Sequence, residues 1–200
     1  MPPQDASEPS TLDLTVVLPA YNEVGHIRAE VERITAALKD SSYSFELLVV
    51  DDGSTDGTPD AVEGMSFVRL IRLGANRGSG TARRIGSTEA HGRYVVWTDA
   101  DMTYPNERIH ELIDILETRR AHQVVGARRT EAGTMKPLRV PAKWAIRRLA
   151  EFLTNSRIPD LNSGFRAFSK QDAKPYLRLL PPGFSCVTTI TLAFLANGMV

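Results

Sequence analysis

The residues of this chain best suited to chemistry are two aspartates one residue apart, Asp99 and Asp101, directly after an apolar run. If the backbone stays extended there, both carboxylates project to the same side. Two such charges at close range need a counter-charge, and Mg²⁺ supplies one while it also binds substrate phosphates. The pair therefore predicts a divalent cation held between protein carboxylates and a diphosphate. A solvated acidic turn is the simpler interpretation of the pair taken by itself.

A second acidic pair, Asp51-Asp52, ends an apolar run that begins at Leu47 and opens a turn-rich segment that extends to Thr58. Carboxylates in this place can accept hydrogen bonds from ribose hydroxyls or from the edge of a base. Glycine, serine and aspartate are also the residues of an ordinary turn that closes a strand. The turn accounts for the glycines but not for an acid directly after a buried run, so both interpretations stay open.

Nearer the amino terminus, the segment from Leu18 to Glu23 carries two side chains suited to a nucleotide. Tyr21 can stack on a base, and Glu23 can accept a hydrogen bond from a ribose or base donor. Acids are also favoured at the start of a helix, and from the residues alone this is the better interpretation.

The glycine-rich segment from Gly74 to Gly80 resembles a phosphate-binding loop at a helix start. It lacks the lysine-serine or lysine-threonine ending of a Walker loop and also a full dinucleotide glycine fingerprint. ATP hydrolysis and hydride transfer are therefore disfavoured, and a flexible connection explains the glycines equally well.

Basic residues gather after the last predicted strand. Arg128 follows that strand directly, and its guanidinium can bind a phosphate through two hydrogen bonds. From Lys136 to Arg148, lysines and arginines alternate with apolar residues such as Trp144. This basic amphipathic stretch suits either a surface of anionic lipid headgroups or an ordinary solvated helix face.

An alternation of short apolar runs and helical patterns positions these residues. The predicted strands cover residues 15–18, 45–50, 68–73, 94–98 and 123–127, and helices begin near Ile27, Thr58, Gly80 and Asn106, the last an expected N-cap. This order predicts an α/β domain with a mainly parallel sheet flanked by helices. Because ligands of such sheets bind beyond the carboxyl ends of the strands, we expect the polar residues that follow them to converge on one edge.

Composition limits the class of protein. The chain has 200 residues, enough for one domain, and its 24 lysines and arginines equal its 24 aspartates and glutamates. The zero net charge gives no reason to expect a nucleic-acid partner. Residues 1–12 are polar and rich in proline, so we predict a disordered leader. No apolar run reaches the ~20 residues that a membrane span needs.

In order along the chain, these motifs resemble those of the family 2 inverting glycosyltransferases, and within them the dolichol-phosphate mannosyltransferase-like branch that uses polyprenyl phosphates. The resemblance covers about residues 14–200. It depends on four motifs in register, which are Leu18-Pro19-Ala20-Tyr21-Asn22-Glu23, Val50-Asp51-Asp52-Gly53-Ser54-Thr55-Asp56-Gly57-Thr58, Thr98-Asp99-Ala100-Asp101 and Asp160-Leu161-Asn162-Ser163-Gly164-Phe165-Arg166.

The resemblance implies a GT-A (nucleotide-diphospho-sugar transferase) domain over residues 13–200. It implies Asp101 as the principal ligand of Mg²⁺ or Mn²⁺, with Asp99 assisting, and Arg128 at the acceptor phosphate. Thr103 stands where the family has glutamine or serine. The family continues with another strand and a basic loop, so we expect this domain to be cut short at its C-terminus. The remaining implied nucleotide and diphosphate contacts are Pro19, Tyr21, Glu23, Val50, Asp52 and Ala100.

The implied reaction transfers a sugar from GDP-mannose or a UDP-sugar to a polyprenyl phosphate with inversion, at the cytoplasmic face of a membrane. One alternative is transfer to an alcohol, for which Asp160 is the candidate base. Another is a catalytically silent module that binds a nucleotide sugar. A nucleotidyltransferase is disfavoured because the first strand lacks a glycine-rich loop with lysine or arginine. The identity of the sugar and of the base stays open.

Overall fold

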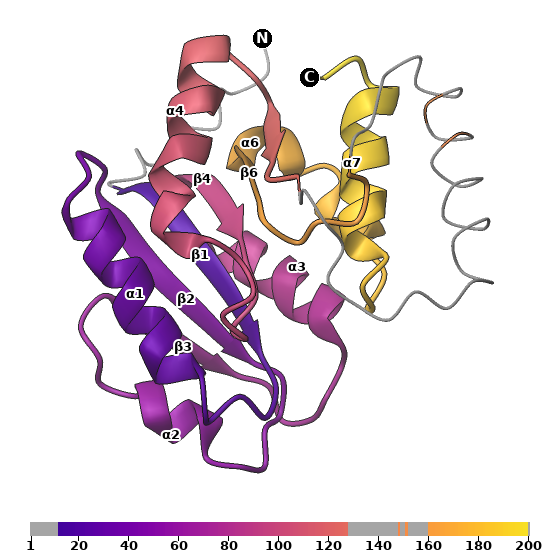
Figure 1. The fold of residues 1–200 in the computed structure, drawn as a ribbon. Helices are drawn as coiled ribbons and strands as arrows, with labels where there is room; N and C mark the ends of the chain where they lie inside the picture. Colours follow the sequence, from indigo (N-terminus) through magenta and orange to yellow (C-terminus); the bar gives the residue numbers. More distant parts are fainter. Residues whose placement is uncertain (1–11, 128–147, 149–150, 152–159, 200) are drawn as a thin grey trace, which may run out of the picture.

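A six-stranded sheet forms the centre of the molecule, in the order β3-β2-β1-β4-β6-β5 (Figure 1). The computed structural model describes residues 12–127, 148, 151 and 160–199. The first four strands pair in parallel, whereas β6 lies antiparallel between β4 and β5. The predicted mainly parallel sheet is therefore confirmed. The strands are β1 Leu12–Ala20, β2 Phe45–Asp51, β3 Val68–Arg72, β4 Gly92–Trp97, β5 Gln123–Val125 and β6 Arg166–Ser169.

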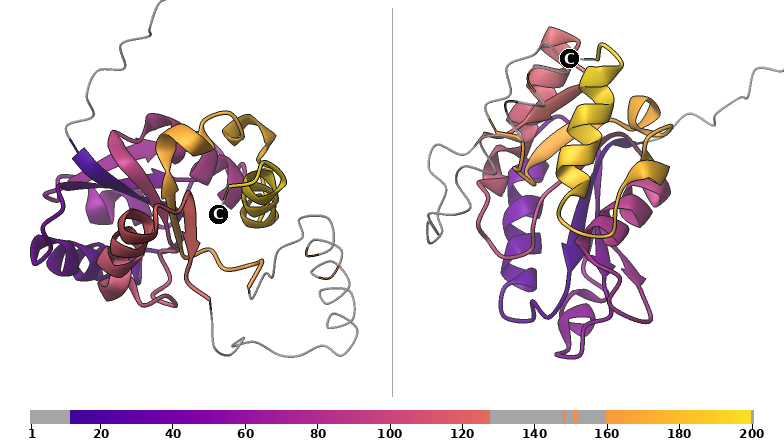
Figure 2. Two further views of the ribbon diagram at one scale, coloured as in Figure 1. Left: turned by 90° about the horizontal axis from the view of Figure 1, so that it is seen from above. Right: turned by 90° about the vertical axis from the view of Figure 1, so that its right-hand side faces the viewer.

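Helices cover both faces of the sheet (Figure 2). Alternate residues of a strand point to opposite faces, so Val16 packs toward α1 and α4 while Val17 packs toward α3 and α7. Two turns of 3-10 helix, η1 and η2, complete the connections. The helical elements are α1 Ile27–Lys39, α2 Thr58–Val62, α3 Ser79–Glu89, η1 Asn106–Arg108, α4 Ile109–Arg119, α6 Lys170–Ala173, η2 Leu177–Leu179 and α7 Cys186–Ala196.

The helix predicted to begin near Ile27 is α1, and an apolar stripe forms its core-facing side. Ile27, Val31, Ile34 and Leu38 are all fully buried. Each such side chain stabilises the fold by roughly 1.5–3 kcal/mol relative to an exposed position. The stripe therefore fixes α1 on the sheet, and with α1 the loop that precedes it after β1.

Asn106 differs from its predicted role as a helix cap. Its side chain is fully buried, where its amide oxygen accepts a hydrogen bond from the Thr98 hydroxyl at 2.6 Å and its amide nitrogen donates to Glu30. The reason is that Glu30, on α1, is itself a buried carboxylate that needs donors. The sequence pattern showed the polar residue before a helix but not the buried acid beside it.

Several expectations lie outside the described residues. The predicted leader does so except for Leu12, which begins β1, and the basic amphipathic stretch from Lys136 to Arg148 does so except for Arg148. Within the described residues, no helix combines the length and the apolar character that crossing a bilayer requires.

Candidate functional site

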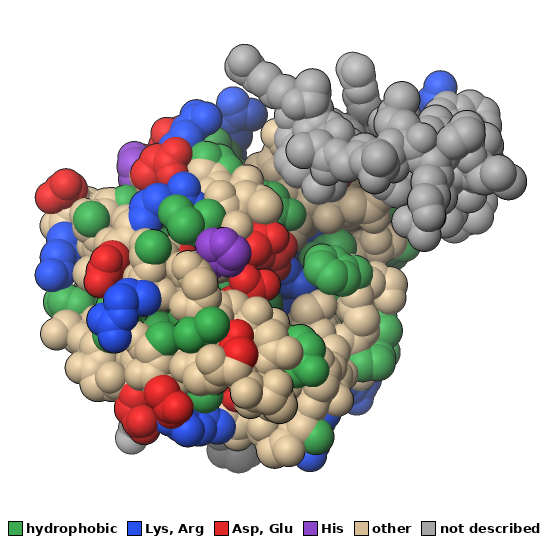
Figure 3. Space-filling model, turned by 60° about the horizontal axis from the view of Figure 1, so that its bottom comes forward, with side chains coloured by type: hydrophobic (Ala, Val, Ile, Leu, Met, Phe, Trp, Pro, Cys, Tyr) green, Lys and Arg blue, Asp and Glu red, His purple; other side chains and the backbone are tan. Residues whose placement is uncertain are grey.

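Two pockets lie beyond the carboxyl ends of the parallel strands. The smaller has a volume of about 380 Å³ and the larger about 770 Å³. Among the residues that the structure describes, three line both pockets, namely Asp99, Asp101 and Phe184. Figure 3 shows acidic side chains gathered at a hollow in this face of the molecule. The predicted convergence of strand-end residues on one edge is therefore observed.

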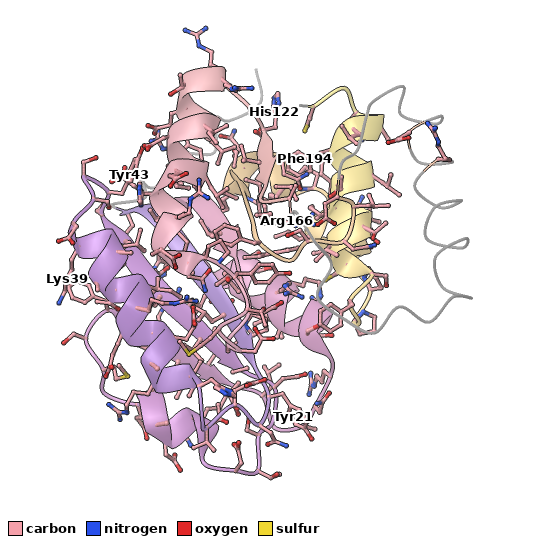
Figure 4. The ribbon with its side chains drawn as sticks, in the orientation of Figure 1. Tyr21, Lys39, Tyr43, His122, Arg166 and Phe194 are labelled. Carbon is pink, nitrogen blue, oxygen red and sulfur yellow. The ribbon has the colours of Figure 1, made fainter. Side chains whose placement is uncertain are left out.

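The smaller pocket is lined mainly by residues at or just after the ends of β1, β2 and β4. Tyr21 stands at its rim, 45% exposed, in the loop after β1 (Figure 4). Glu23 and Asp52 line the same hollow from neighbouring strand ends. Seven residues from the sequence prediction meet here, which are Pro19, Tyr21, Glu23, Asp52, Asp99, Ala100 and Asp101.

The loops after β1 and β2 lock each other in place. Asn22 has a φ of 57°, and its side-chain oxygen accepts the Thr55 N–H at 2.9 Å. In return, the Asn22 N–H donates to the Ser54 hydroxyl at 2.9 Å and the Glu23 N–H to the Thr58 hydroxyl at 2.8 Å. Polar side chains of the loop after β2 thus bind backbone N–H groups of the loop after β1. In that arrangement, Tyr21 and Glu23 line the smaller pocket.

Asp52 has a structural task in addition to its place in the pocket. It is only 2% exposed, and its two carboxylate oxygens accept the backbone N–H groups of Arg77 at 2.8 Å and Gly78 at 2.7 Å. These bonds fix the glycine-rich loop against the end of β2. Its predicted contact with a nucleotide stays a prediction.

The glycine-rich loop does not bind a phosphate through the start of α3. The N–H groups of Gly80 and Thr81 instead donate to the carbonyl oxygen of Pro182, at 2.6 and 3.3 Å. A Cβ added at Gly80 would lie 2.1 Å from the Pro181 carbonyl oxygen, so only glycine fits. The phosphate-loop interpretation is wrong at this helix start, because the segment 181–183 occupies the position that a phosphate would take.

Asp99 receives its counter-charge from the chain. The guanidinium of Arg83, on α3, forms an ion pair with Asp99 Oδ1. Arg83 is fully buried, between the ring of Trp97 at 5.8 Å and that of Phe184 at 5.7 Å from the guanidinium carbon to the ring centroid. The expectation that both aspartates need a metal ion as counter-charge is therefore too simple, because an arginine already serves one of them.

Asp101 is exposed at the junction of the two pockets. Its Oδ1 accepts hydrogen bonds from the hydroxyl of Thr103 at 2.6 Å and from the Thr103 N–H at 3.1 Å, which hold the side chain in one orientation. The described residues include no cluster of three or more acids, histidines or cysteines able to hold a metal. The donor set fits a cation shared with a diphosphate, because Mg²⁺ commonly binds through one or two carboxylates plus substrate phosphates.

A partly buried hydrogen-bond network fixes the loop that carries Asp101. Arg33 on α1 bonds both oxygens of Glu30 at 2.9 Å and the carbonyl oxygen of Tyr104 at 2.7 Å. The hydroxyl of Tyr104 accepts the Gly164 N–H at 2.9 Å. A charged side chain on α1 therefore positions the loop that carries Asp101, and Tyr104 of that loop in turn positions the segment after residue 160.

The larger pocket lies against α4, β5 and the segment that follows residue 160. Besides Asp99 and Asp101, the charged residues described at this pocket are Arg108 and Glu111, which form an ion pair at 2.6 Å. The wall is otherwise mainly apolar, and the ring of Tyr104 stacks on that of Phe165 at 5.6 Å between centroids. The apolar lining residues are Tyr104, Pro105, Leu112, Ile115, Val124, Val125, Ala127, Phe165 and Phe184.

Comparison with known proteins decides the family. The sequence model of glycosyl transferase family 2 matches residues 15–177. The chain belongs to this family. A relative from Rhizobium johnstonii, dodecaprenyl-phosphate galacturonate synthase, is 28% identical over 165 residues, which cover 79% of this chain and 48% of the relative. Undecaprenyl-phosphate 4-deoxy-4-formamido-L-arabinose transferase from Aeromonas hydrophila is 35% identical over 122 residues, 58% of this chain and 36% of that protein.

The chain thus spans about half or less of the length of these relatives. Solved structures show the same fold. Glucosyl-3-phosphoglycerate synthase from Mycobacterium tuberculosis, in complex with Mn²⁺, UDP-glucose and glycerol 3-phosphate, superimposes with a TM-score of 0.71 at 25% identity over 94% of this chain and 68% of that one. The predicted GT-A fold and the resemblance to polyprenyl-phosphate glycosyltransferases are confirmed.

Three of the described residues expected in this family 2 site do not line the smaller pocket. The Val50 side chain is fully buried in the core, facing Gly86 of α3. Thr103 lines the larger pocket rather than the smaller one. Asp160 is absent from the described residues that line either pocket, and its Oδ1 accepts the Asn162 N–H at 2.9 Å. Arg128 lies outside the described residues.

Arg166, from the fourth family motif, is a structural residue. It is fully buried between β6 and α7 (Figure 4) and donates to the carbonyl oxygens of Ser163 at 3.1 Å and Val187 at 2.7 Å. Burial, together with the charge of Arg83, lowers the pKa of Arg166 to about 9, so it remains charged at neutral pH. Arg166 therefore ties the segment beside the larger pocket to α7.

Sequence reasoning missed Arg83, Arg108 and Phe184. A signal existed for Arg83, which lies among the small residues Gly80, Gly86 and Ser87 at helical spacing, where a charge is out of place unless it is paired. Arg108 and Phe184 follow no comparable pattern. They reach the site through the folding of segments far apart in the sequence.

Proposed function

We propose that this chain transfers a sugar from a nucleoside-diphosphate sugar to a polyprenyl phosphate, with inversion and with dependence on Mg²⁺ or Mn²⁺. The observation that carries the proposal is the meeting of two pockets at Asp99 and Asp101. A transferase that joins two substrates needs two binding sites that share the reacting centre. The relatives described above are named for dodecaprenyl phosphate and undecaprenyl phosphate, which supports the choice of acceptor.

The donor fits the smaller pocket. In the proposed complex, Tyr21, which is half exposed at the rim, stacks on the base, and Glu23 accepts a hydrogen bond from the base or ribose. Asp99 and Asp101 then lie at the diphosphate, where Thr103 holds Asp101 in orientation. A divalent cation bound there would neutralise the leaving nucleoside diphosphate and act as a Lewis acid.

The acceptor fits the larger pocket, whose apolar wall suits a lipid chain and which opens onto the same two aspartates. A phosphate nucleophile is already ionised at neutral pH, so it needs no protein base. The position of Asp160, outside the residues described at either pocket, agrees with this and argues against an alcohol acceptor that Asp160 activates. We assign orientation of the acceptor phosphate to Arg128.

The lipid acceptor places the reaction at a membrane surface. We propose the cytoplasmic face, with the basic stretch from Lys136 to Arg148 as the contact with anionic headgroups. That stretch lies outside the described residues apart from Arg148.

The direct test is a transfer assay. Labelled UDP-glucose, UDP-glucuronate and GDP-mannose are incubated with the chain and undecaprenyl phosphate in detergent, with Mn²⁺, with Mg²⁺ or with EDTA. We expect labelled lipid with one donor, loss of product in EDTA and recovery on adding metal. Binding of a donor without product would indicate a silent module, and product in EDTA would contradict the metal role. Transfer to a lipid alcohol but not to the phosphate would contradict the acceptor.

A further inference from the structure

Phe184 lies at the junction of the two pockets. With Asp99 and Asp101, it is one of three described residues that line both pockets. Its ring is 68% exposed. A single exposed aromatic residue is ordinary on a protein surface, so exposure by itself means little. The position of Phe184 is what suggests a role, because the other two residues that line both pockets are the acids assigned to the diphosphate.

The backbone on both sides of Phe184 is anchored. Pro182, two residues before it, accepts the Gly80 N–H at 2.6 Å, and the close approach of this segment to α3 requires glycine at Gly78 and Gly80. Cys186, two residues after it, is fully buried and begins α7. The ring is therefore presented to the junction from a fixed backbone rather than from a loose loop.

The ring also has a fixed neighbour beneath it. The guanidinium carbon of Arg83 lies 5.7 Å from the centroid of the Phe184 ring, and Arg83 holds Asp99. A cation at this distance from a ring centroid is attracted to the ring. The contact sets the position of the ring relative to the aspartates while most of its surface stays exposed.

The transferred group must lie where the two pockets meet. If the diphosphate binds at Asp99 and Asp101, the sugar bonded to it extends toward the larger pocket, and the third shared residue is then its neighbour. The C–H groups on one face of a sugar ring form an apolar surface that can pack on an aromatic ring. Phe184 offers such a ring beside two acids, which bind the polar end of the same molecule.

We propose that Phe184 is the platform on which the transferred sugar packs, and that it thereby contributes to the choice of sugar. This inference depends on the proposed function and adds to it a residue that contacts the sugar but not the nucleotide. The variants Phe184→Ala, Phe184→Leu and Phe184→Tyr test it. Leu179→Ala is the matched control, since Leu179 is 56% exposed and is absent from the described residues at either pocket.

The measurement compares each nucleotide sugar with its own nucleoside diphosphate. Dissociation constants for UDP, UDP-glucose, UDP-glucuronate, GDP and GDP-mannose are determined by calorimetry with Mn²⁺, using for the comparison the donor that gives transfer. We expect Phe184→Ala to weaken binding of that donor on the order of tenfold and binding of the matching diphosphate less than about twofold. Phe184→Tyr, which keeps the ring, should bind like the wild type, and Phe184→Leu should lie between.

Equal weakening of donor and diphosphate, or no weakening of either, would overturn the inference. So would an increased KM for undecaprenyl phosphate with unchanged donor binding, because the ring would then contact the acceptor. Failure of the proposed function looks different, since the wild type itself would then bind none of the nucleotide sugars or would bind one without forming product. Melting temperatures of Phe184→Ala and Leu179→Ala check the fold, and Phe184→Leu repeats the test with more side-chain volume retained.

Discussion

The two ends of the sheet contain the same kinds of polar side chain, which differ in whether they face the protein interior or a pocket. At the amino end, Glu46 on β2 receives hydrogen bonds from the Thr15 hydroxyl at 2.7 Å, from Arg69 Nε at 3.0 Å and from the His91 N–H at 2.8 Å. At the carboxyl end, Asp99 pairs with Arg83, and Asp101 accepts from the Thr103 hydroxyl at 2.6 Å. The amino end thus has one carboxylate bonded to both an arginine and a threonine, whereas the carboxyl end has two, one bonded to an arginine and the other to a threonine.

The difference lies in what the carboxylates face. Glu46 is buried and surrounded by donors from the chain. Burial raises its pKa, but the hydrogen bonds from Arg69, His91 and Thr15 outweigh this and lower the pKa below its ordinary value. Asp99 and Asp101 instead line two pockets. A carboxylate closed off by its own chain stabilises the fold, whereas one that faces a pocket remains able to bind a ligand.

The largest expected effect comes from Asp101→Asn. The substitution removes the charge proposed to hold the cation and the diphosphate, so we expect kcat/KM to fall by at least about 100-fold. The melting temperature should not change, because Asp101 is exposed. Asp60→Asn removes the same charge from an exposed site on α2 and should keep full activity. Full metal-dependent turnover by Asp101→Asn would contradict the proposed role of the carboxylates at the carboxyl end of the sheet.

The two arginines give the next contrast. Arg83→Met leaves Asp99 partly buried without its counter-ion, which should cost about 3 kcal/mol of unfolding free energy and also lower transfer. Arg69→Met breaks the pair with Glu46 at a more exposed position and should cost about 1–2 kcal/mol while activity is unchanged. Urea unfolding and transfer assays on both variants check this. Full activity of Arg83→Met would show that Asp99 does not depend on its partner.

The variant Glu46→Gln tests how the carboxylate at the amino end of the sheet contributes to stability as the pH changes. The amide places an NH₂ group against hydrogen-bond donors, so we expect a loss of about 1–2 kcal/mol at pH 7 with transfer unchanged. Because folding lowers the pKa of Glu46, its contribution is present above the unfolded pKa and is lost as the pH falls through the folded value. The difference in unfolding free energy between wild type and variant should therefore narrow as the pH falls below the ordinary pKa of glutamate, about 4.3. A gap that stays constant with pH would contradict this.

The sequence predicts the carboxylates at the carboxyl end of the sheet but not the buried carboxylate at the amino end. The acids of the site follow apolar runs at the ends of predicted strands, and a parallel sheet brings such ends together. That rule placed Asp52, Asp99 and Asp101 correctly at one edge. Glu46 lies within a strand, where alternation suggests a solvent-facing side chain, and nothing local indicates that Arg69 and His91 will surround it.

The rest of the site depends on contacts between distant segments. Pro182 fills the start of α3, about a hundred residues away in the chain, and thereby turns an apparent phosphate loop into a packing site. Phe184 reaches the aspartates only because of that docking. Local sequence patterns indicate which side chains of a helix or strand face the core. They contain no information on which remote backbone carbonyl will accept hydrogen bonds from the N–H groups at the start of a helix.

The two threonines provide the smallest and most closely matched test. Thr15 and Thr103 each donate a hydroxyl hydrogen bond to a carboxylate, at 2.7 and 2.6 Å. Thr15→Val should lower the unfolding free energy by about 1–2 kcal/mol, because it leaves both Glu46 and the Gly92 N–H short of a partner, and should leave transfer unchanged. Thr103→Val should keep the melting temperature and raise the metal concentration for half-maximal activity about threefold, since Asp101 keeps only the backbone N–H.

Metal titrations of the transfer assay, with urea unfolding in parallel, separate the two results. If Thr15→Val lowered activity at temperatures where it is folded, the amino end would be coupled to the site through β1. If Thr103→Val melted early while its metal requirement stayed the same, the loop after β4 would serve the fold rather than the cation. Valine has nearly the shape of threonine, so either result would concern the hydroxyl and not the packing.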